Sequence, residues 1–270
     1  MEQPGWVSTG IDLDRPSVAR VYDYFLGGAH NFAIDRQLAE AIGGMTPAVG
    51  ETMRANRAFL RRAVRFLVGA GVTQFLDIGS GIPTVGNVHD IAQRADPSSR
   101  VVYVDIDPIV VSHSRVILAG DHRTAVIQKD SRDVEGILAD PETRRLLDLD
   151  RPVAVLLLGV LHFVPDCDEP AGIVSRLRAA VPPGSYVALL NVTHEGQPPD
   201  VIEAQKLMGR TGMPIRLRSR PELLDQLAGL TVVEPGLVHL PLWRPDSPLD
   251  VDDHPERFGA LAAIGRKDQP

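Results

Sequence analysis

Three aspartates in the sequence each follow a short apolar run, and two glycines come just after the first of them. The runs are QFLDI, RVVYVDI and TAVIQKD, which carry Asp77, Asp105 and Asp130. Gly79 and Gly81 follow the first run. Small residues at such a turn let a ligand approach the backbone, and a helix that starts behind the turn presents free N–H groups. The pattern predicts a cofactor site.

Two cofactor classes use this kind of turn, the dinucleotides and S-adenosylmethionine. A dinucleotide site typically has G-x-G-x-x-G, in which the third glycine allows close packing around the pyrophosphate. Thr84 occupies that third position here. A carboxylate at Asp77 would repel a pyrophosphate but suits the ammonium group of S-adenosylmethionine, which carries no phosphate. The turn therefore favours S-adenosylmethionine. The alternative is that Asp77 has a structural role alone and caps backbone amides.

Acidic residues at the ends of the next two runs extend the pattern. Asp105 lies 24 residues after Gly81, where a carboxylate can accept hydrogen bonds from both ribose hydroxyls. Asp130, followed by Ser131, is placed to accept the adenine amino group. Asp107 precedes a proline and is expected to be the N-cap of a helix. Taken singly such aspartates are commonly turn residues, but ligands of open α/β sheets gather at this edge.

Five apolar runs alternate with helical patterns and must position these residues. They are QFLDI, RVVYVDI, TAVIQ, PVAVLLLG and SYVALLNV. Near-continuous apolar strands separated by helices imply a parallel sheet covered on both faces, so the predicted fold is doubly wound α/β and Rossmann-like. LTVVEPGLVHLPLW and ERFGALAAIGRK then indicate two strands with no helix between them, an antiparallel finish. A helix with Ser219 as N-cap is predicted just before them.

The first 45 residues differ in amino-acid composition from the rest of the sequence. They contain the aromatic run YDYF and two glycine pairs, at 27–28 and 43–44, which give hinge-like backbone freedom. We expect an N-terminal helical cap over residues 1–45 and a Rossmann-like domain over residues 46–270. Tyr22, His30 and Asn31 are expected to point from this cap toward an acceptor. The alternative is an arm that packs on the core for stability alone.

A long helix is predicted to follow, with Thr46 as N-cap and its end near Gly69. Arginines at positions 54, 57, 61 and 65 recur at helical spacing and so share one face. Such a stripe can bind RNA phosphates, but the acidic chain and the lack of interleaved aromatics favour a solvated outer face.

The composition limits the partners and the compartment. The formal charge is −7 over 270 residues, which disfavours phosphate backbones and anionic membranes. The single cysteine, Cys167, cannot form an internal disulfide or a thiolate cluster. No apolar stretch approaches the roughly 20 residues that cross a bilayer, and the N-terminus lacks a signal-peptide layout. We expect a cytoplasmic protein with no metal site and no membrane partner, and we do not expect nucleic acid as its partner.

Several motifs together resemble a known family. DIGSG, YVDID, KDSRD and VAVLLLGVLHFVPD are similar to the successive motifs of class I S-adenosylmethionine-dependent methyltransferases. RPSVARVYDYFLGGAHNFAIDRQLAE, MRANRAFLRRAVRFL and EPGLVHLPLWRPD resemble, more narrowly, the bacterial S-adenosyl methyltransferase family long known as a domain of unknown function. The resemblance covers almost the whole chain and implies a seven-stranded sheet, mostly parallel with an antiparallel last strand. Pro83 replaces the family's usual third glycine, so we expect a stiffer loop and a helix that begins there.

The resemblance also implies site residues. The methionine moiety would lie against the glycine turn, the ribose against the second strand end, the adenine against the third, and the fourth strand end would lie beneath the cofactor. The implied cofactor-binding residues are Asp77, Gly79, Gly81, Asp105, Asp130, Ser131, Gly159 and Val160. To these we add, as our own expectation, the neighbouring Ser80, Ile106 and Asp107 and the cap residues Tyr22 and Asn31.

The acceptor site is less defined by the sequence. His162 follows the fourth strand, where related methyltransferases place acceptor residues, and it can take a proton from a hydroxyl or amine or serve only as a strand-end hydrogen-bond partner. Tyr22 and His30 are the other catalytic candidates. We expect methyl transfer to an unidentified small-molecule acceptor. The alternatives are a protein that binds S-adenosylmethionine without catalysis and, less favoured, a nicotinamide-dependent oxidoreductase.

Overall fold

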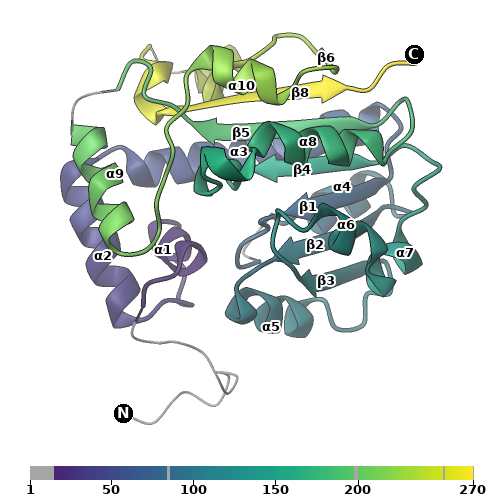
Figure 1. Cartoon of the computed structure of the whole chain (residues 1–270), viewed down its shortest axis with the longest axis horizontal. Coiled ribbons are helices and arrows are strands. Elements are labelled where there is room, and N and C mark those ends of the chain that lie inside the picture. The colour runs from purple at the N-terminus through teal and green to yellow at the C-terminus, as the bar shows by residue number, and fades with distance from the viewer. Residues whose placement is uncertain (1–14, 84–85, 198–199, 252, 270) are drawn as a thin grey trace.

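The computed structural model describes residues 15–83, 86–197, 200–251 and 253–269. Residues 1–14 of the expected cap and Thr84, which bore on the cofactor class, lie outside these ranges. The centre of the molecule is a mixed sheet with helices on both faces (Figure 1). Its order is β3-β2-β1-β4-β5-β8-β6, with β7 also paired to β8. The strands are β1 (Gln74–Ile78), β2 (Arg100–Asp105), β3 (Thr124–Gln128), β4 (Ala154–Leu158), β5 (Tyr186–Val192), β6 (Thr231–Val232), β7 (Val238–His239) and β8 (Ala260–Arg266).

The predicted parallel strands are confirmed as β1 to β5, which pair in parallel from β3 across to β5. β8 runs antiparallel to β5, and the two-residue strands β6 and β7 both pair with β8, which confirms the antiparallel finish. The sixth strand of the expected seven is therefore split into two short pieces. Pro235, between them, lacks the N–H that a continuous sheet ladder would need.

Two layers of helices cover the sheet, as the apolar strands require. One face packs on α3 (Val49–Gly69), α4 (Val88–Ala95) and α5 (Pro108–Ile117). The other face packs on α6 (Val134–Ala139), α7 (Pro141–Leu146), α8 (Pro170–Ala179) and α10 (Arg220–Gln226). The doubly wound architecture is confirmed. It brings the carboxyl ends of the parallel strands to one edge of the sheet.

Two helix starts differ from the prediction. α3 begins at Val49, because the Thr46 N–H bonds back to Ile42 and Thr46 therefore closes the preceding helix. α4 begins at Val88 and not at Pro83. Its N-terminus is set by Asn87, whose backbone N–H donates to Asp90 at 3.1 Å. Ser219 does precede α10, where its backbone N–H and hydroxyl both donate to Glu222.

A third group of helices, which we name the cap layer, stands at the carboxyl edge of the strands (Figure 1). It consists of α1 (Val18–Phe25), α2 (Ala33–Met45) and α9 (Asp200–Arg210). These helices share a small core that includes Val21, Leu38, Ile42, Met208 and Met213. The glycine pair at 43–44 lies inside α2 and forms no hinge there. In the described part of the chain, every helix is too short or too polar to cross a lipid bilayer.

Candidate functional site

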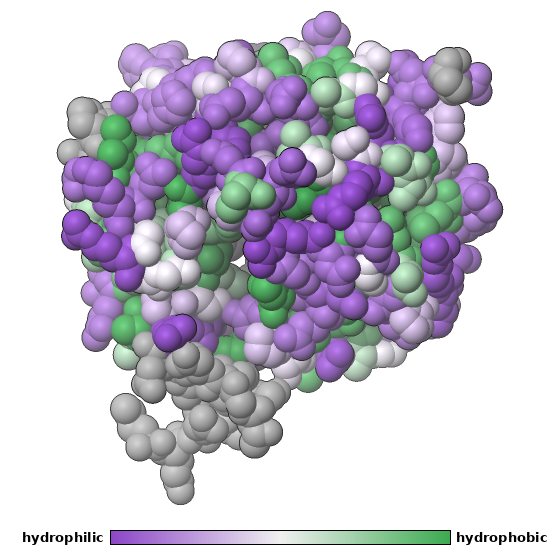
Figure 2. Space-filling view, viewed as in Figure 1, coloured by the Kyte–Doolittle hydropathy of each residue, from purple (hydrophilic) through white to green (hydrophobic). Residues whose placement is uncertain are grey.

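A cavity of ≈ 590 Å³ lies between the strand ends and the cap layer. Figure 2 shows the surface hollowed between these two parts, with hydrophobic residues visible in the hollow and mostly hydrophilic ones around it. The cavity lining brings together most of the residues predicted from the sequence. These are Tyr22, Asp77, Gly79, Ser80, Gly81, Asp105, Ile106, Asp107, Asp130, Ser131, Gly159, Val160 and His162.

The glycine turn after β1 allows a close approach to the backbone. Gly79 and Gly81 have φ angles of 74° and 68°, a region that favours glycine. A Cβ on Gly79 would lie 2.6 Å from Cγ2 of Val160, so only glycine fits there. A Cβ on Gly81 would meet no atom within 4 Å, which leaves room beside it for a ligand. The buried hydroxyl of Ser80 has no hydrogen-bond partner among the described residues.

Asp105 both faces the cavity and shapes this turn. Its carboxylate accepts the backbone N–H of Gly81 at 2.8 Å and that of Asp107 at 2.9 Å. Burial raises the pKa of Asp105 to about 6, against the effect of these hydrogen bonds. A substitution at Asp105 must therefore change the turn as well as any ligand contact.

Asp107 is the N-cap of α5, as the proline after it predicts. One carboxylate oxygen accepts the backbone N–H of Ile109 at 2.8 Å. The other accepts a hydrogen bond from the hydroxyl of Ser17, which precedes α1. Asp107 thus connects the cap layer to the end of β2.

Asp77 is buried below the glycine turn beside an arginine from α3. Burial raises the pKa of Asp77 to about 7, with Arg57 acting in the opposite direction. The prediction that Arg57 lies on a solvated outer face is wrong, because it lines the cavity. Arg61 and Arg65, in contrast, are exposed on the outer face and pair with Asp246. Arg54 is exposed too.

At the end of β3, the Asp130 carboxylate is already engaged by an arginine. The Arg132 Nη2 lies 2.6 Å from Oδ2 of Asp130, and this hydrogen bond lowers the Asp130 pKa. Nη1 of Arg132 reaches Asp168 at 2.6 Å on the other side. The proposed contact of Asp130 with an adenine amino group would share the carboxylate with Arg132.

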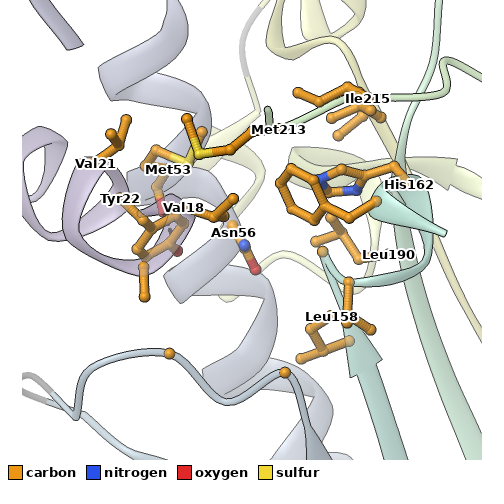
Figure 3. A pocket seen from close by; sticks show the side chains of 18 of the residues that line it. Val18, Val21, Tyr22, Met53, Asn56, Leu158, His162, Leu190, Met213 and Ile215 are labelled. Atoms are coloured by element: carbon orange, nitrogen blue, oxygen red, sulfur yellow. Dashed lines mark hydrogen bonds between the residues drawn. The ribbon is translucent and has the colours of Figure 1, made fainter. Parts of the chain in front are cut away.

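His162 and Asn56 converge over the end of β4. A Cβ on Gly159 would lie 3.6 Å from Nδ2 of Asn56 and 3.7 Å from Cε1 of His162. Figure 3 shows the two side chains on opposite walls of the cavity, Asn56 from α3 and His162 from the turn after β4. Burial lowers the pKa of His162 to about 4, so the imidazole is neutral near pH 7. Asn56 was not predicted from the sequence.

The turn that carries His162 is held from behind by the segment before α10. The backbone N–H of Arg216 donates to the carbonyl of His162 at 2.7 Å. The buried Arg218 donates to the carbonyls of Leu161 and Val164, both at 2.8 Å. These bonds fix the backbone on both sides of the imidazole.

Of the three residues expected to point inward from the cap, Tyr22 lines the cavity. Its hydroxyl donates to the Met53 carbonyl at 3.3 Å, and burial raises its pKa to about 12. His30 and Asn31 do not line the cavity, contrary to the prediction. Their side of the cap faces the buried Asp23, which accepts the His30 backbone N–H at 2.8 Å and the Asn31 side-chain amide at 2.9 Å.

Away from the strand ends the cavity wall is apolar, and the sequence did not reveal this. The wall comes from α1, α2, α3, α9 and residues 212–217, and includes Val21, Ile42, Met53, Met208, Met213 and Ile215. On α3 the signal was present as a stripe at helical spacing, Val49, Met53, Asn56 and Leu60. Among the described residues, no three His, Cys, Asp or Glu side chains gather as a metal site would need.

Comparison with known proteins identifies one family by sequence and by structure. The family model described as S-adenosyl methyltransferase matches residues 4–268. A candidate methyltransferase from Thermobifida fusca YX is 41% identical, with a TM-score of 0.93 over 98% of this chain and 100% of that one. A DUF574 family protein from Streptomyces avermitilis MA-4680 is 42% identical, with a TM-score of 0.91 over 95% of this chain and 99% of that one.

A more distant structure shares the fold alone. Human N-acetylserotonin methyltransferase in complex with SAM is 14% identical, with a TM-score of 0.51 over 94% of this chain and 63% of that one. No curated protein matches the chain.

Proposed function

Because the chain belongs to the S-adenosyl methyltransferase family and is an S-adenosylmethionine-dependent methyltransferase, we propose that it methylates a small molecule held between the strand ends and the cap layer. The observation that carries the proposal is the continuity of one cavity. The same ≈ 590 Å³ space is lined by the glycine turn, by Asn56 and His162 beside the end of β4, and by apolar side chains of the cap layer. A donor and a small acceptor can therefore lie in contact within it.

The strand-end residues fit S-adenosylmethionine. The open space beside Gly81 admits a ligand close to the backbone, and the Ser80 hydroxyl has an unused hydrogen-bonding capacity among the described residues. The buried Asp77 carboxyl offers a counter-charge to an ammonium group, which pyrophosphate could not use. We assign the methionine moiety to Asp77, Gly79, Ser80 and Gly81.

The remaining strand ends would hold the nucleoside. Asp105 is assigned to the ribose, and Asp130 with Ser131 to the adenine. Ile106, with 61% of its surface exposed, offers an apolar face for the adenine ring at the second strand end. Gly159 and Val160 would lie beneath the cofactor.

The chain's part in the chemistry is to align the acceptor and exclude water. When bound, S-adenosylmethionine supplies a methyl group on a sulfonium leaving group. The acceptor gains this methyl group, the carbon–sulfur electron pair stays on sulfur, and the acceptor gives up one proton. His162, neutral near pH 7, is placed to take that proton, while Asn56 and Tyr22 orient the acceptor from the cap side.

The cavity fits two alternative functions less well than it fits methyl transfer. A nicotinamide-dependent oxidoreductase would have to place a pyrophosphate beside the Asp77 carboxyl. A protein that only senses S-adenosylmethionine would not need an apolar space that continues beyond the strand ends. The expected domain division, a cap over residues 1–45 and a catalytic domain over 46–270, is part of our proposal, with α9 added to the cap layer.

The test uses the full-length protein and methyl-labelled S-adenosylmethionine. Incubated with a bacterial cell extract, the protein should move the label into the small-molecule fraction, and Asp105→Ala should reduce that transfer. Label that moves only into protein or RNA would contradict the small-molecule proposal. In parallel, S-adenosylhomocysteine should raise the melting temperature, whereas NAD(H) at equal concentration should not.

A further inference from the structure

We propose that the acceptor is an uncharged, mostly apolar molecule that presents one hydroxyl group to Asn56 and His162. The inference rests on the proposed function and narrows its acceptor class. It comes from the apolar part of the cavity wall beside the ends of β4 and β5, which we name the acceptor chamber. Side chains from α1, α3, β5 and residues 212–217 form this chamber, including Val18, Val21, Met53, Leu190, Met213 and Ile215 (Figure 3).

The cavity that contains the acceptor chamber, at ≈ 590 Å³, is too large to be a packing defect of a protein core. Voids in well-packed interiors seldom exceed the size of a water molecule. Here, α1 and α3 stand apart from the ends of β4 and β5, and the apolar side chains face one another across the gap (Figure 3). An apolar space gains most from a ligand whose own surface is apolar. Methionines such as Met53 and Met213 also adapt to the faces of aromatic rings.

The charged side chains that line the cavity lie mostly outside the acceptor chamber. Of the charged residues that line the cavity, most lie at or just after the ends of β1, β2 and β3, namely Asp77, Asp105, Asp107, Lys129, Asp130 and Arg132. Arg57 lies near Asp77 and acts on its pKa. Arg257 pairs with Glu51 at 2.7 Å. The side chains named as the chamber wall, in contrast, are all uncharged, so an ionic acceptor there would have no counter-charge among them.

The missing counter-charge decides between acceptor chemistries. Transfer of an ionised group into an apolar space without a partner is strongly unfavourable. An alkylamine is protonated near pH 7 and would need a carboxylate here. A hydroxyl is neutral and needs one hydrogen-bond acceptor and one donor. His162 and Asn56 can supply both at the point where the chamber meets the end of β4.

Binding of matched probes tests the inference. The full-length protein, saturated with S-adenosylhomocysteine, is titrated calorimetrically with 2-naphthol, 2-naphthoate and 2-naphthylmethylammonium at pH 7. These probes share one apolar ring system and differ in charge. We expect 2-naphthol to bind at least about tenfold more tightly than either ion, because each ion would enter the chamber without a counter-charge. An ion that binds as tightly as 2-naphthol overturns the inference.

Two matched substitutions, one in the chamber wall and one outside the cavity lining, test whether 2-naphthol binds in the chamber. Ile215→Gln places an amide in the chamber wall and should weaken 2-naphthol about tenfold with little change in S-adenosylhomocysteine affinity. Ile202→Gln is the matched control, since Ile202 lies on α9 with 48% of its surface exposed and outside the cavity lining. If Ile215→Gln melts early, Met53→Gln replaces it. Unchanged 2-naphthol affinity in the folded lining variant also overturns the inference.

The inference and the proposed function fail in different ways. Absence of S-adenosylhomocysteine binding would remove the proposed site itself. Normal S-adenosylhomocysteine binding, combined with label transfer from S-adenosylmethionine into a charged metabolite of the extract, would keep the proposed function and reject the apolar acceptor.

Discussion

The hydroxyl of Ser17 donates a hydrogen bond to the carboxylate of Asp107, and this bond joins the start of α1 to the strand end that faces the cavity. The same carboxylate caps α5 through the backbone N–H of Ile109. Asp107 therefore couples the position of the cap layer to the loop beside the proposed ribose site. We therefore expect a ligand that orders this loop to stabilise the observed position of α1 as well.

Ser17→Ala tests that coupling. A hydrogen bond to a charged group contributes about 1.5–3 kcal/mol, so α1 should open more often and exchange its amide hydrogens faster. Hydrogen exchange of residues 18–25, with and without S-adenosylhomocysteine, measures the effect. Ser98→Ala, which removes a hydroxyl from an exposed loop bond to Asp96, is the control. Equal protection of α1 in both variants would argue against the coupling.

A buried ion pair should hold the cap as a unit. Nε of Arg20 lies 2.9 Å from Oδ2 of Asp35, and the two side chains are only 2% and 0% exposed. Arg20→Met leaves Asp35 buried without its partner, a change that typically costs about 3–5 kcal/mol. If residues 1–45 form a separate unit, hydrogen exchange should rise in α1 and α2 and remain slow in β1 to β5. Faster exchange throughout the sheet would reject the domain division.

Cofactor affinity should depend on pH through Asp77. Its pKa is about 7 in the unbound protein, whereas a bound ammonium group favours the ionised carboxylate. Binding at pH 6 must therefore release a proton, so S-adenosylhomocysteine should bind about tenfold more tightly at pH 8 than at pH 6. Calorimetry across this range measures the change. Asp77→Asn, which has no proton to release, should give a flatter profile.

The same shift acts on stability with a defined sign. The pKa of Asp77 is raised in the folded state above the value near 3.8 of an unfolded chain. The folded state then binds more protons than the unfolded state between about pH 4 and pH 7, so stability of the unbound protein should fall as the pH rises through this window. Asp105, with a pKa of about 6, acts in the same direction. Thermal melts should show a smaller decline in Asp77→Asn.

Asp105 and Asp107 should separate ligand binding from helix capping. Asp105→Ala should cost about 1.5–3 kcal/mol of S-adenosylhomocysteine affinity, since it removes a charged acceptor from the ribose and loosens the turn at Gly81. Asp107→Ala should mainly lower stability, by about 1 kcal/mol for the lost N-cap and further for the lost hydrogen bond from Ser17. Paired titrations and melts distinguish them. Equal losses of affinity would show that the assignment of the ribose is wrong.

His162 should affect turnover more than binding. His162→Gln keeps a polar side chain at the end of β4 but cannot take a proton, so label transfer to small molecules should fall by about 10²-fold or more. S-adenosylhomocysteine affinity should stay near that of the unmodified protein. Because the pKa of His162 is about 4, its titration should limit the rate only below about pH 5. A rate unaffected by the substitution would leave His162 a structural residue.

The sheet and its ligand edge could be predicted because their signal is local. A parallel strand buried on both faces reads as a continuous apolar run, and all five runs correspond to strands. The residue after such a run must lie at the carboxyl edge, so Asp77, Asp105 and Asp130 could be brought to one cavity without knowledge of long-range contacts.

The rest of the site depends on how the helices pack against one another and against the sheet. A local sequence pattern does not predict this packing, because it involves residues far apart in the sequence. Arg57 belongs to a stripe of arginines that looks uniform in the sequence, yet it lies on the side of α3 that meets Asp77. Asn56 and the methionine wall depend on how α3 and α9 pack. His30 and Asn31 looked like acceptor residues because of their chemistry, but the buried Asp23 engages their polar groups.

The cap layer joins α1 and α2 to a segment that is synthesised much later, α9 and the residues after it. Its core joins Val21 and Ile42 to Met208 and Met213. On the ribosome, at about 5–20 residues per second, Met208 follows α1 by roughly 10–40 seconds. α1 and α2 are therefore synthesised well before the segment that completes their shared core. Until α9 emerges, Val21 and Ile42 lack their packing partners Met208 and Met213, so we expect the incomplete cap layer to be prone to aggregation.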